Sequence, residues 1–503
     1  MALALIPDVT FHFGLRDVVL LLAAAPLVYI LYQRLLSPLA NVPGPFLGYI
    51  SRWWLVYHSR RGDMNIVIPE LHRKYGKIVR TGPNEVSVAD IDAIKQIYGP
   101  GSKFCKSPWY SVWKGAQSVD LFAERDIAVH GALRRNVSRM YAMSSMTALE
   151  PWVDDALACF MAQIRARMNE RLDLGLWVQL LAFDVIGEVS FSQRFGYLEA
   201  GKDDGTFGRI ERALQSLCWV GQVPWVFWLD HYLAPFIGSQ LDVKLRHGAI
   251  RNFAAEQVNA RRQVSSDHQD ILGQLFQVKK EKPNQVNDAT ITSIATANIF
   301  AGSDTTAISL RAIFYFLATN PRCLSKLRQE IHERGVDGRL KFPIRFSEAN
   351  AMPYLQACIQ EALRLHPAVG MSLPRVVPPG GLTIGQQFIP EGTIVGANPW
   401  VIHRDPSVWG ADVDAYRPER WLEGNRGEME RCFLAFGGGA RSCIGKNISL
   451  LEMTKVVPTL INEFDIQLEP GHQHLDQKCF WFVKQDGFIV RLRPRQKTVE
   501  EDP

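Results

Sequence analysis

The chain has 503 residues, of which 47% are hydrophobic and 10% aromatic, and this is enough apolar material for a large buried core. Its 56 Lys and Arg side chains exceed its 51 Asp and Glu side chains by only five and form no basic blocks, which argues against a nucleic-acid-binding protein. The eight cysteines are scattered without a CxxC pair, and this indicates reduced thiols facing a cytosol.

The first apolar segment extends from about Leu15 to Leu36, and its centre from Val18 to Tyr32 carries no charge. About 20 helical residues just span a bilayer, so we expect residues 1–36 to form a retained N-terminal transmembrane anchor. A cleaved signal peptide and a buried helix are the alternatives, but no clean small-x-small cleavage site follows Tyr29, and Arg34 comes soon after. Arginines are more frequent after the segment than before it, which places the main body in the cytosol.

Residues 37–48 follow the predicted anchor and are rich in proline. Pro38, Pro43 and Pro45 fix their φ angles and remove backbone donors, so this segment predicts a stiff hinge rather than a continuing helix. Residues 49–503 show no internal repeat and no second linker, and we expect them to form a single large domain.

Helical patterns dominate the large domain. The longest candidate helix runs from about Asn287 to Thr319, with Asn287 or Asp288 as its N-cap and Asn320-Pro321 as its stop. About 32 residues extend roughly 50 Å, enough to cross the whole domain. Short strand-like runs lie at Ile78 to Val88, Leu382 to Phe388, Thr393 to Ala397, Phe464 to Leu468 and Phe488 to Leu492. We therefore predict a mainly α fold with small β-sheets.

The most informative segment is Phe436-Gly-Gly-Gly-Ala-Arg-Ser-Cys-Ile-Gly445. Its three successive glycines let the backbone turn tightly and approach a flat ligand, and they leave N–H groups free to hydrogen-bond a thiolate at Cys443. Arg441 adds positive charge, and a helix that begins near Ile444 points the positive end of its dipole at the sulfur. The segment therefore favours a deprotonated, ligating cysteine.

An inert cysteine on a glycine turn and a phosphate-binding glycine loop are the alternatives, but neither needs Phe, Arg and Cys at these offsets. The segment matches Phe-Gly-x-Gly-x-Arg-x-Cys-x-Gly at every position, and so it resembles the haem-binding loop of the cytochrome P-450 family, microsomal type. The resemblance covers nearly the whole chain. It implies a cytochrome P-450 fold with residues 49–503 as the catalytic domain, Cys443 as the axial ligand of the iron of haem b (iron protoporphyrin IX), and Phe436 and Gly437 as further cofactor contacts.

A second motif, Ala301-Gly-Ser-Asp-Thr-Thr306, lies inside the long helix. Gly302 lacks a side chain, so the helix could press close to a porphyrin, and Thr305 could hydrogen-bond the carbonyl one turn back and kink the helix to make room for O2. A polar interruption in a buried helix is the alternative. Given the resemblance, we expect Asp304 and Thr305 to be catalytic residues that deliver protons, and Ala301 and Gly302 to contact the cofactor.

The resemblance also implies that cations hold the two haem propionates. We expect Arg134, Arg375 and Arg441 to do so, with His130 as a further contact. Many family members carry tryptophan at the position of His130, and a surface histidine is the alternative interpretation there.

Glu361 and Arg364 stand at i and i+3 on one predicted helix, where their side chains can pair. A solvated surface pair is the alternative. In the resembling family this pair joins a later arginine, here Arg420, in a structural network that holds the cysteine-bearing layer together.

The resemblance implies a haem-thiolate monooxygenase that inserts one atom of O2 into an apolar small molecule, by hydroxylation, epoxidation or a related oxidation. No GxGxxG turn follows a strand, so electrons are expected from NADPH through a separate NADPH-cytochrome reductase, with cytochrome b5 as a further partner. The basic residues Arg441, Lys446 and Lys455 are the expected docking surface. The implied location is the endoplasmic reticulum membrane, with the catalytic domain in the cytosol.

The substrate pocket is expected from mostly apolar and aromatic segments. These are Trp109 to Phe122, the surroundings of Ala297 and Ala301, Val369 to Leu373, and Trp481-Phe482. The stretches Trp109 to Tyr141 and Asp414 to Trp421 resemble fungal members related to pisatin demethylase, which suggests secondary metabolism and a terpenoid, polyketide or alkaloid substrate.

Three other interpretations stay open. His403-Arg404-Asp405 with His472 or His474 resembles the two-histidine, one-carboxylate site of a non-haem iron oxygenase, although that class usually has a β jelly roll. A haem-thiolate isomerase or dehydratase that needs no external electrons, and a non-catalytic haem-binding protein, are closer alternatives. The Asp304-Thr305 pair argues against both.

Overall fold

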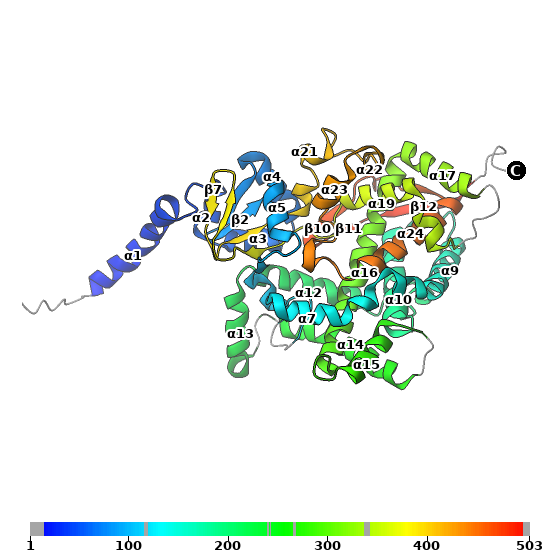
Figure 1. Cartoon of the computed structure of the whole chain (residues 1–503), viewed down its shortest axis with the longest axis horizontal. Coiled ribbons are helices and arrows are strands. Elements are labelled where there is room, and N and C mark those ends of the chain that lie inside the picture. The colour runs from blue at the N-terminus through cyan, green and yellow to red at the C-terminus, as the bar shows by residue number, and fades with distance from the viewer. Residues whose placement is uncertain are drawn as a thin grey trace, which may run out of the picture.

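The computed structural model describes residues 15–114, 119–238, 241, 243–264, 268–335 and 343–495. Over these residues the chain is mainly helical with small sheets, which confirms the predicted fold class. Figure 1 shows the helices gathered around α16, with β1, β2 and β7 on the side of the molecule from which α1 projects. The longer helices are α1 (Leu15–Leu31), α3 (Trp53–Arg61), α4 (Met64–Tyr75), α5 (Ile91–Tyr98), α7 (Ile127–Val137), α9 (Glu150–Ala166), α10 (Leu174–Phe191), α12 (Thr206–Val220), α13 (Pro224–Ile237), α14 (Val243–Gln263), α15 (Ile271–Glu281), α16 (Asp288–Thr319), α17 (Pro321–Gly335), α19 (Pro353–Leu365) and α24 (Lys446–Glu463).

The long helix α16 forms the centre of the domain and confirms the boundaries expected from the sequence. Asn287 caps it by accepting a hydrogen bond from the backbone N–H of Thr290 at 2.9 Å, and the helix ends before Asn320. Most of its side chains are buried, and it packs against α10, α14, α19 and α24. A helix enclosed on so many sides can be apolar around most of its surface, as its sequence is.

Within the described residues the strands form four small sheets. The largest has the order β1-β2-β8-β5-β3, and the others are β4-β12-β9, β10-β11 and β6-β7. The strands are β1 (Ile78–Gly82), β2 (Glu85–Val88), β3 (Cys105–Lys106), β4 (Arg171–Asp173), β5 (Arg375–Val376), β6 (Leu382–Ile384), β7 (Gln387–Ile389), β8 (Ile394–Gly396), β9 (Phe464–Leu468), β10 (Asp476–Phe480), β11 (Phe482–Asp486) and β12 (Ile489–Pro494). All five predicted strand runs contain strands. Strands β3, β4 and β5 and the β10-β11 hairpin were not predicted from the sequence.

The apolar helix α1 projects from the body of the molecule (Figure 1). The window Val18–Leu36 has a mean hydropathy of 1.8 and is not buried, so by length and composition it could cross a membrane. The helix α10 passes the same test, but 89% of its window is buried, as in the core helix of a soluble protein. Residues 1–14 of the expected anchor lie outside the described residues.

The predicted hinge, residues 37–48, is packed against the large domain. Leu39 and Val42 are buried, and the backbone N–H of Arg80 on β1 donates to the carbonyl of Pro43 at 2.7 Å. The fully buried guanidinium of Arg80 donates to the carbonyls of Gln33 and Leu39 at 2.9 and 3.1 Å. With the side-chain oxygens of Gln33 and Ser37 and the carbonyls of Gly82 and Pro83, six acceptors surround this guanidinium and compensate its buried charge, so the base of α1 is fixed to the sheet.

Candidate active site

The cysteine loop joins the short helix α23 (Arg426–Cys432) to α24. Gly437 and Gly439 have φ values of +68° and +56°, which favour glycine over other residues. A Cβ atom on Gly439 would lie 2.3 Å from the carbonyl oxygen of Tyr98, so the loop can approach the end of α5 only with glycine there. The backbone N–H of Cys443 donates to the carbonyl of Phe436 at 2.8 Å and closes the loop.

The exposure of two enclosed residues indicates a hollow beside the cysteine loop. Cys443 is exposed, and so is Ala301 of the central helix α16, although the adjacent Phe300 is buried. On the cysteine side, Thr306 of α16 and Ser449 of α24 share a hydrogen bond of 2.7 Å, which ties the two helices together. A residue in the middle of an enclosed helix is exposed only where it borders a cavity. A flat group ligated by Cys443 and facing Ala301 therefore fits these residues.

The electrostatics around the thiol differ in one respect from the expectation. Although Cys443 is exposed to the hollow, the protein around it keeps bulk water away from the sulfur and so raises its pKa, while the backbone N–H groups of Gly445 and Lys446 and the guanidinium of Arg134 act in the opposite direction. Arg134, and not Arg441, is the nearby arginine, because Arg441 donates to the backbone carbonyls of Glu124 and Arg125 instead. The local groups alone do not make the thiol acidic. A metal bound to the sulfur would, since a coordinating thiol is deprotonated.

Basic side chains gather next to the cysteine loop. Arg134 donates to the carbonyl of Ser442 at 2.8 Å, and the buried Arg375 donates to the hydroxyl of Tyr110 at 3.3 Å. Burial and the neighbouring Arg375 lower the pKa of Arg441 to about 10. Mutual repulsion of this kind indicates a surplus of positive charge, which a ligand with carboxylates would neutralise.

Lys106 of β3 belongs to the same basic group and was missed by the sequence analysis. It is buried, and its Nζ donates to the carbonyl of Phe122. Burial first, then Arg375 and Arg441, lower its pKa well below the ordinary lysine value. Nothing in its flanking sequence distinguishes it from a surface lysine.

His130 of α7 is buried, so the alternative of a surface histidine is wrong. Burial, Arg441 and Lys106 together lower the pKa of His130 to about 3. The ring is therefore neutral at physiological pH, and it can contact an acidic ligand as an N–H donor but not as a cation.

The two expected proton-delivery residues point in different directions from α16. The hydroxyl of Thr305 donates to the carbonyl of Ala301 at 2.7 Å, as expected, but α16 continues through this point as a regular α-helix. Asp304 is buried and accepts a hydrogen bond of 2.6 Å from Gln179 on α10. Burial raises the pKa of Asp304, which favours its protonated form. Among the described residues no hydrogen bond joins Asp304 to Thr305, so the direct relay expected from the sequence is not formed.

Gly302 has a role in helix packing that was not predicted from the sequence. A Cβ atom on Gly302 would lie 2.8 Å from Cδ1 of Ile186 on α10. Glycine is therefore required by the close packing of α16 on α10, and Ala301 is the residue of this pair that faces the hollow.

Glu361, Arg364 and Arg420 form one buried network. Arg364 donates to both carboxylate oxygens of Glu361 at 2.8 and 2.9 Å, and Arg420 of α22 (Arg420–Glu423) donates to the same carboxylate at 2.8 Å. All three side chains are almost fully buried, so the alternative of a solvated surface pair is wrong. Trp421 adds a fourth hydrogen bond, from its indole N–H to Glu361 at 3.0 Å.

The histidines of the rival iron site have other roles. His403 accepts from the backbone N–H of Leu434 at 2.8 Å and bonds the carbonyl of Arg364 at 3.0 Å, which leaves neither ring nitrogen for a metal. No group of three or more His, Cys, Asp or Glu side chains in the described part of the chain could hold a metal ion. His403 instead fastens the entrance of the cysteine loop to α19, a role that the sequence analysis did not foresee.

The expected docking surface also needs correction. Lys455 is fully buried in α24, where it forms an ion pair with Asp154 at 2.9 Å and hydrogen-bonds the carbonyl of Ile344. Only Lys446 of the three proposed residues is exposed, and Arg441 is half-buried.

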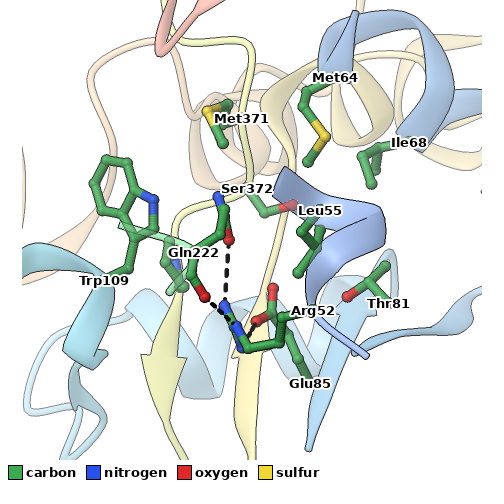
Figure 2. Close-up of a pocket in the computed structure, with 11 residues that line it drawn as sticks. Arg52, Leu55, Met64, Ile68, Thr81, Glu85, Trp109, Gln222, Met371 and Ser372 are labelled. Carbon is green, nitrogen blue, oxygen red and sulfur yellow. Dashed lines mark hydrogen bonds and ion pairs between the residues drawn. The ribbon is translucent and has the colours of Figure 1, made fainter. Parts of the chain in front are cut away.

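A small pocket lies near the expected substrate segments (Figure 2). Arg52 closes one side of it through an ion pair with Glu85 at 2.5 Å and a hydrogen bond to the carbonyl of Gln222 at 2.6 Å. Trp109 lines the pocket from another side, and its indole also stacks on Trp481. The pocket is thus separated from the described aromatic residues near α16 by the ring of Trp109.

Comparison with known proteins decides the family. The model of the family described as Cytochrome P450 matches residues 42–492. The chain belongs to the cytochrome P450 family. This cytochrome P450 is 40% identical over 484 residues to the cytochrome P450 monooxygenase hepC of Aspergillus oryzae, which covers 93% of this chain and 95% of the relative. It is 38% identical over 491 residues to the cytochrome P450 monooxygenase cicH of Emericella nidulans, with coverages of 93% and 96%. It is 34% identical over 507 residues to the pisatin demethylase of Fusarium vanettenii, with coverages of 97% and 95%.

These relatives confirm the expected family and enzyme class. The protein is a monooxygenase of the cytochrome P450 family, which uses haem and receives electrons from a redox partner. The resemblance to fungal members related to pisatin demethylase is confirmed as well. The interpretations as a non-haem oxygenase, an isomerase or a non-catalytic haem protein are set aside.

Proposed function

We propose that this cytochrome P450 inserts one atom of O2 into an apolar small molecule of fungal secondary metabolism, with Cys443 as the axial ligand of haem b. The observation that carries the proposal is the exposed cysteine at the edge of a hollow bordered by Ala301. Bound haem b supplies the activation of O2, and a thiolate ligand donates the electron density that favours cleavage of the O–O bond. Phe436 and Gly437 shape the loop that presents the sulfur.

The basic group around the cysteine loop supports binding of the haem propionates. Arg134, Arg375 and Arg441 supply charge, and Lys106 extends the set proposed from the sequence. The neutral ring of His130 supplies an N–H donor at the same place. Each of these groups gains a carboxylate partner in this arrangement, which offsets the unfavourable burial of so much positive charge.

Asp304 and Thr305 are proposed to manage the protons. Thr305 is partly exposed near Ala301, so its hydroxyl is placed to hydrogen-bond a ligand in the hollow. The Asp304 carboxyl accepts a hydrogen bond from Gln179 on the other side of α16, and burial raises its pKa. A rotation of the Asp304 side chain, or an intervening water, is needed to pass a proton from Asp304 to the Thr305 hydroxyl.

The electrons are proposed to come from NADPH through a membrane-bound NADPH-cytochrome reductase, with cytochrome b5 as a further donor. Lys446 is exposed at the start of α24, next to the cysteine loop, and suits an acidic partner surface. The apolar helix α1 supports a single-pass anchor in the endoplasmic reticulum membrane, with the catalytic domain in the cytosol.

The axial ligand is tested by Cys443→Ser in the full-length, haem-supplied protein. The reduced carbon monoxide complex of the variant should lose the red-shifted absorption band that thiolate ligation causes. Cys159→Ser, which changes a partly exposed thiol on α9, is the matched control and should keep the band. Survival of the band in Cys443→Ser would contradict the assignment. Turnover that requires NADPH, the reductase and O2 tests the proposed electron source on the same wild-type preparation.

A further inference from the structure

An aromatic cluster lies beside the part of α16 that contains Ala301. Phe300 precedes Ala301 on α16, and its ring meets the ring of Trp113 on α6 (Ser111–Lys114) edge-on, with centroids 6.0 Å apart at an interplanar angle of 87°. Trp109 and Trp481 stack with centroids 4.6 Å apart and an angle of 29°. The members of the cluster are Trp109, Tyr110, Trp113, Phe122, Phe300 and Trp481.

One polar atom in this cluster has no protein partner. The indole Nε1 of Trp113 is buried, in a residue that is only 5% exposed, and it makes no hydrogen bond to any residue that the structure describes. By contrast, the indole N–H of Trp109 donates to the carbonyl of Cys218 at 3.3 Å, and the hydroxyl of Tyr110 accepts a hydrogen bond of 3.3 Å from Arg375. A buried N–H without an acceptor is costly, and a buried indole N–H usually has a partner.

The backbone of Trp481 supports a functional role for the same cluster. Trp481 connects β10 to β11 with a φ of +75°, a conformation that a bulky side chain rarely adopts. Its carbonyl accepts a hydrogen bond of 3.0 Å from the N–H of Gly370, which holds the turn in place. Glycine or asparagine would fit this turn better, so the ring itself is the reason for tryptophan. Strained residues of this kind cluster at ligand sites.

We propose that the substrate is a planar, unsaturated ring compound with an oxygen acceptor that receives a hydrogen bond from Nε1 of Trp113. This inference rests on the proposed monooxygenase function and narrows its substrate class. Aromatic side chains favour flat π-systems through stacked and edge-on contacts that a saturated ring cannot make. A hydrogen bond from this buried donor would fix which edge of the ring faces Trp113. Trp113 is therefore a positioning residue.

The test uses three small probes on the haem-loaded, full-length enzyme. Coumarin is flat and carries a carbonyl acceptor, naphthalene is flat without an acceptor, and octahydrocoumarin carries the carbonyl but is not flat. Affinities are measured by calorimetry and by the ligand-induced shift of the haem absorption. Octahydrocoumarin should bind at least about threefold more weakly than coumarin, since each aromatic contact contributes about 2- to 12-fold. Equal affinities would overturn the planar-ring part of the proposal.

The hydrogen bond is tested by Trp113→Phe, which keeps an aromatic ring and removes the donor. Coumarin should lose about 3- to 10-fold in affinity, the range for one neutral hydrogen bond, whereas naphthalene should change by less than about twofold. Trp152→Phe on α9, whose ring lies against His268, is the matched control and should leave both affinities unchanged. An equal loss for both probes, or no loss for coumarin, would overturn the role of Trp113.

The reduced carbon monoxide spectrum of each preparation distinguishes failure of the proposed haem-thiolate function from failure of the inferred substrate class. If wild type lacks the red-shifted band, the haem-thiolate function has failed. A normal band without probe discrimination overturns the substrate inference alone. If Trp113→Phe loses its haem, coumarin and 2H-chromene are compared in wild type, because 2H-chromene keeps the fused rings without the carbonyl. Coumarin should then bind about 3- to 10-fold more tightly, and equal binding would show that Trp113 serves the cofactor instead.

Discussion

At the scale of single residues, α16 separates the two groups that a proton relay would use. Thr305 lies on the side of the hollow, and Asp304 lies on the side of α10. This arrangement keeps the carboxyl of Asp304 away from a bound substrate until the Asp304 side chain rotates. Thr305 is then the hydroxyl nearest to the reacting ligand, and its loss should affect proton delivery more than substrate binding.

Thr305→Ala should therefore uncouple electron use from product formation. Product formed per NADPH should fall about tenfold or more, with peroxide or water in its place, because a positioned proton donor contributes roughly 10²–10⁴-fold. The measurement is NADPH consumption against product and peroxide in the reconstituted system. Thr305→Ser keeps the hydroxyl and should stay coupled. Full coupling in Thr305→Ala would remove Thr305 from the proton path.

Glu452 on α24 is another acid that is buried in the protein. It is fully buried, and neither carboxylate oxygen has a hydrogen-bond partner among the described residues. Burial raises its pKa well above the ordinary glutamate value. The folded protein thus keeps a proton on Glu452 that the unfolded chain releases above about pH 4.5.

The stabilising contribution of Glu452 is complete below about pH 4.5 and is lost as the pH rises towards the folded-state pKa. Glu452→Gln cannot lose a proton, so its free energy of unfolding should rise relative to wild type between about pH 5 and 7, by up to about 1.4 kcal/mol per pH unit. Urea unfolding at several pH values measures this difference. Glu391→Gln, at an exposed position, is the control. A difference that does not change with pH would contradict a protonated Glu452.

Sequence reasoning worked best for residues whose chemistry depends on their neighbours in the chain. The cysteine loop needs glycines and a helix start at fixed offsets, so its form was predictable. Lys106 and the unpartnered indole of Trp113 acquire their properties from residues distant in sequence, and no local pattern marks them. Trp481 is harder still, because its positive φ contradicts the usual residue preferences of turns.

At the scale of elements, the Glu361 carboxylate joins α19 to α22. It accepts hydrogen bonds from Arg364, Arg420 and Trp421. His403 extends this contact to the entrance of the cysteine loop through the N–H of Leu434. Buried polar contacts therefore connect the cysteine loop to α19 and α22.

Removing one member of this network should leave a buried charge poorly compensated. Arg420→Ala should lower the free energy of unfolding by about 3–5 kcal/mol and reduce haem retention. Arg426→Ala is the matched control, since Arg426 pairs with Glu430 on an exposed helix face and should change stability by less than about 0.5 kcal/mol. Equal effects of the two variants in urea unfolding would contradict a structural role for Arg420.

The sequence predicted the long helix because caps and apolar spacing agree over its whole length. It predicted strands that are rich in β-branched residues, but not the β10-β11 hairpin, whose turn residue is Trp481. The helical assignment of α16 continues past Thr305, because the hydrogen bond from Thr305 to Ala301 adds to the helical pattern without interrupting it. Local sequence preferences could not predict the close packing of Gly302 against Ile186, because this contact depends on the tertiary structure.

At the scale of the whole molecule, the packed hinge determines how many N-terminal residues can be removed without a loss of stability. A truncation before Tyr32 removes α1 but keeps Gln33, Ser37 and Leu39, whose oxygens accept hydrogen bonds from Arg80. It should release the protein from membranes with its stability intact. A truncation before Asn41 should also lower the free energy of unfolding by about 2 kcal/mol or more, because Arg80 loses charged hydrogen bonds.

Membrane flotation and urea unfolding of both truncated proteins measure these outcomes. Retention of both on membranes would contradict α1 as the only attachment. It would assign part of the attachment to α13, where Trp225, Tyr232 and Phe236 are exposed, the last by 83%. Equal stabilities would contradict the role of Arg80.

The hydrogen bonds between Arg80 and the base of α1 affect how the catalytic domain is oriented at a membrane. If α1 spans a bilayer as proposed, the hydrogen bonds between its base and Arg80 prevent it from turning independently of the sheet, so any tilt of the helix is passed on to the whole domain. Spanning helices tilt more in thin bilayers than in thick ones. The thickness of the bilayer would thus set the orientation of the catalytic domain relative to the membrane surface.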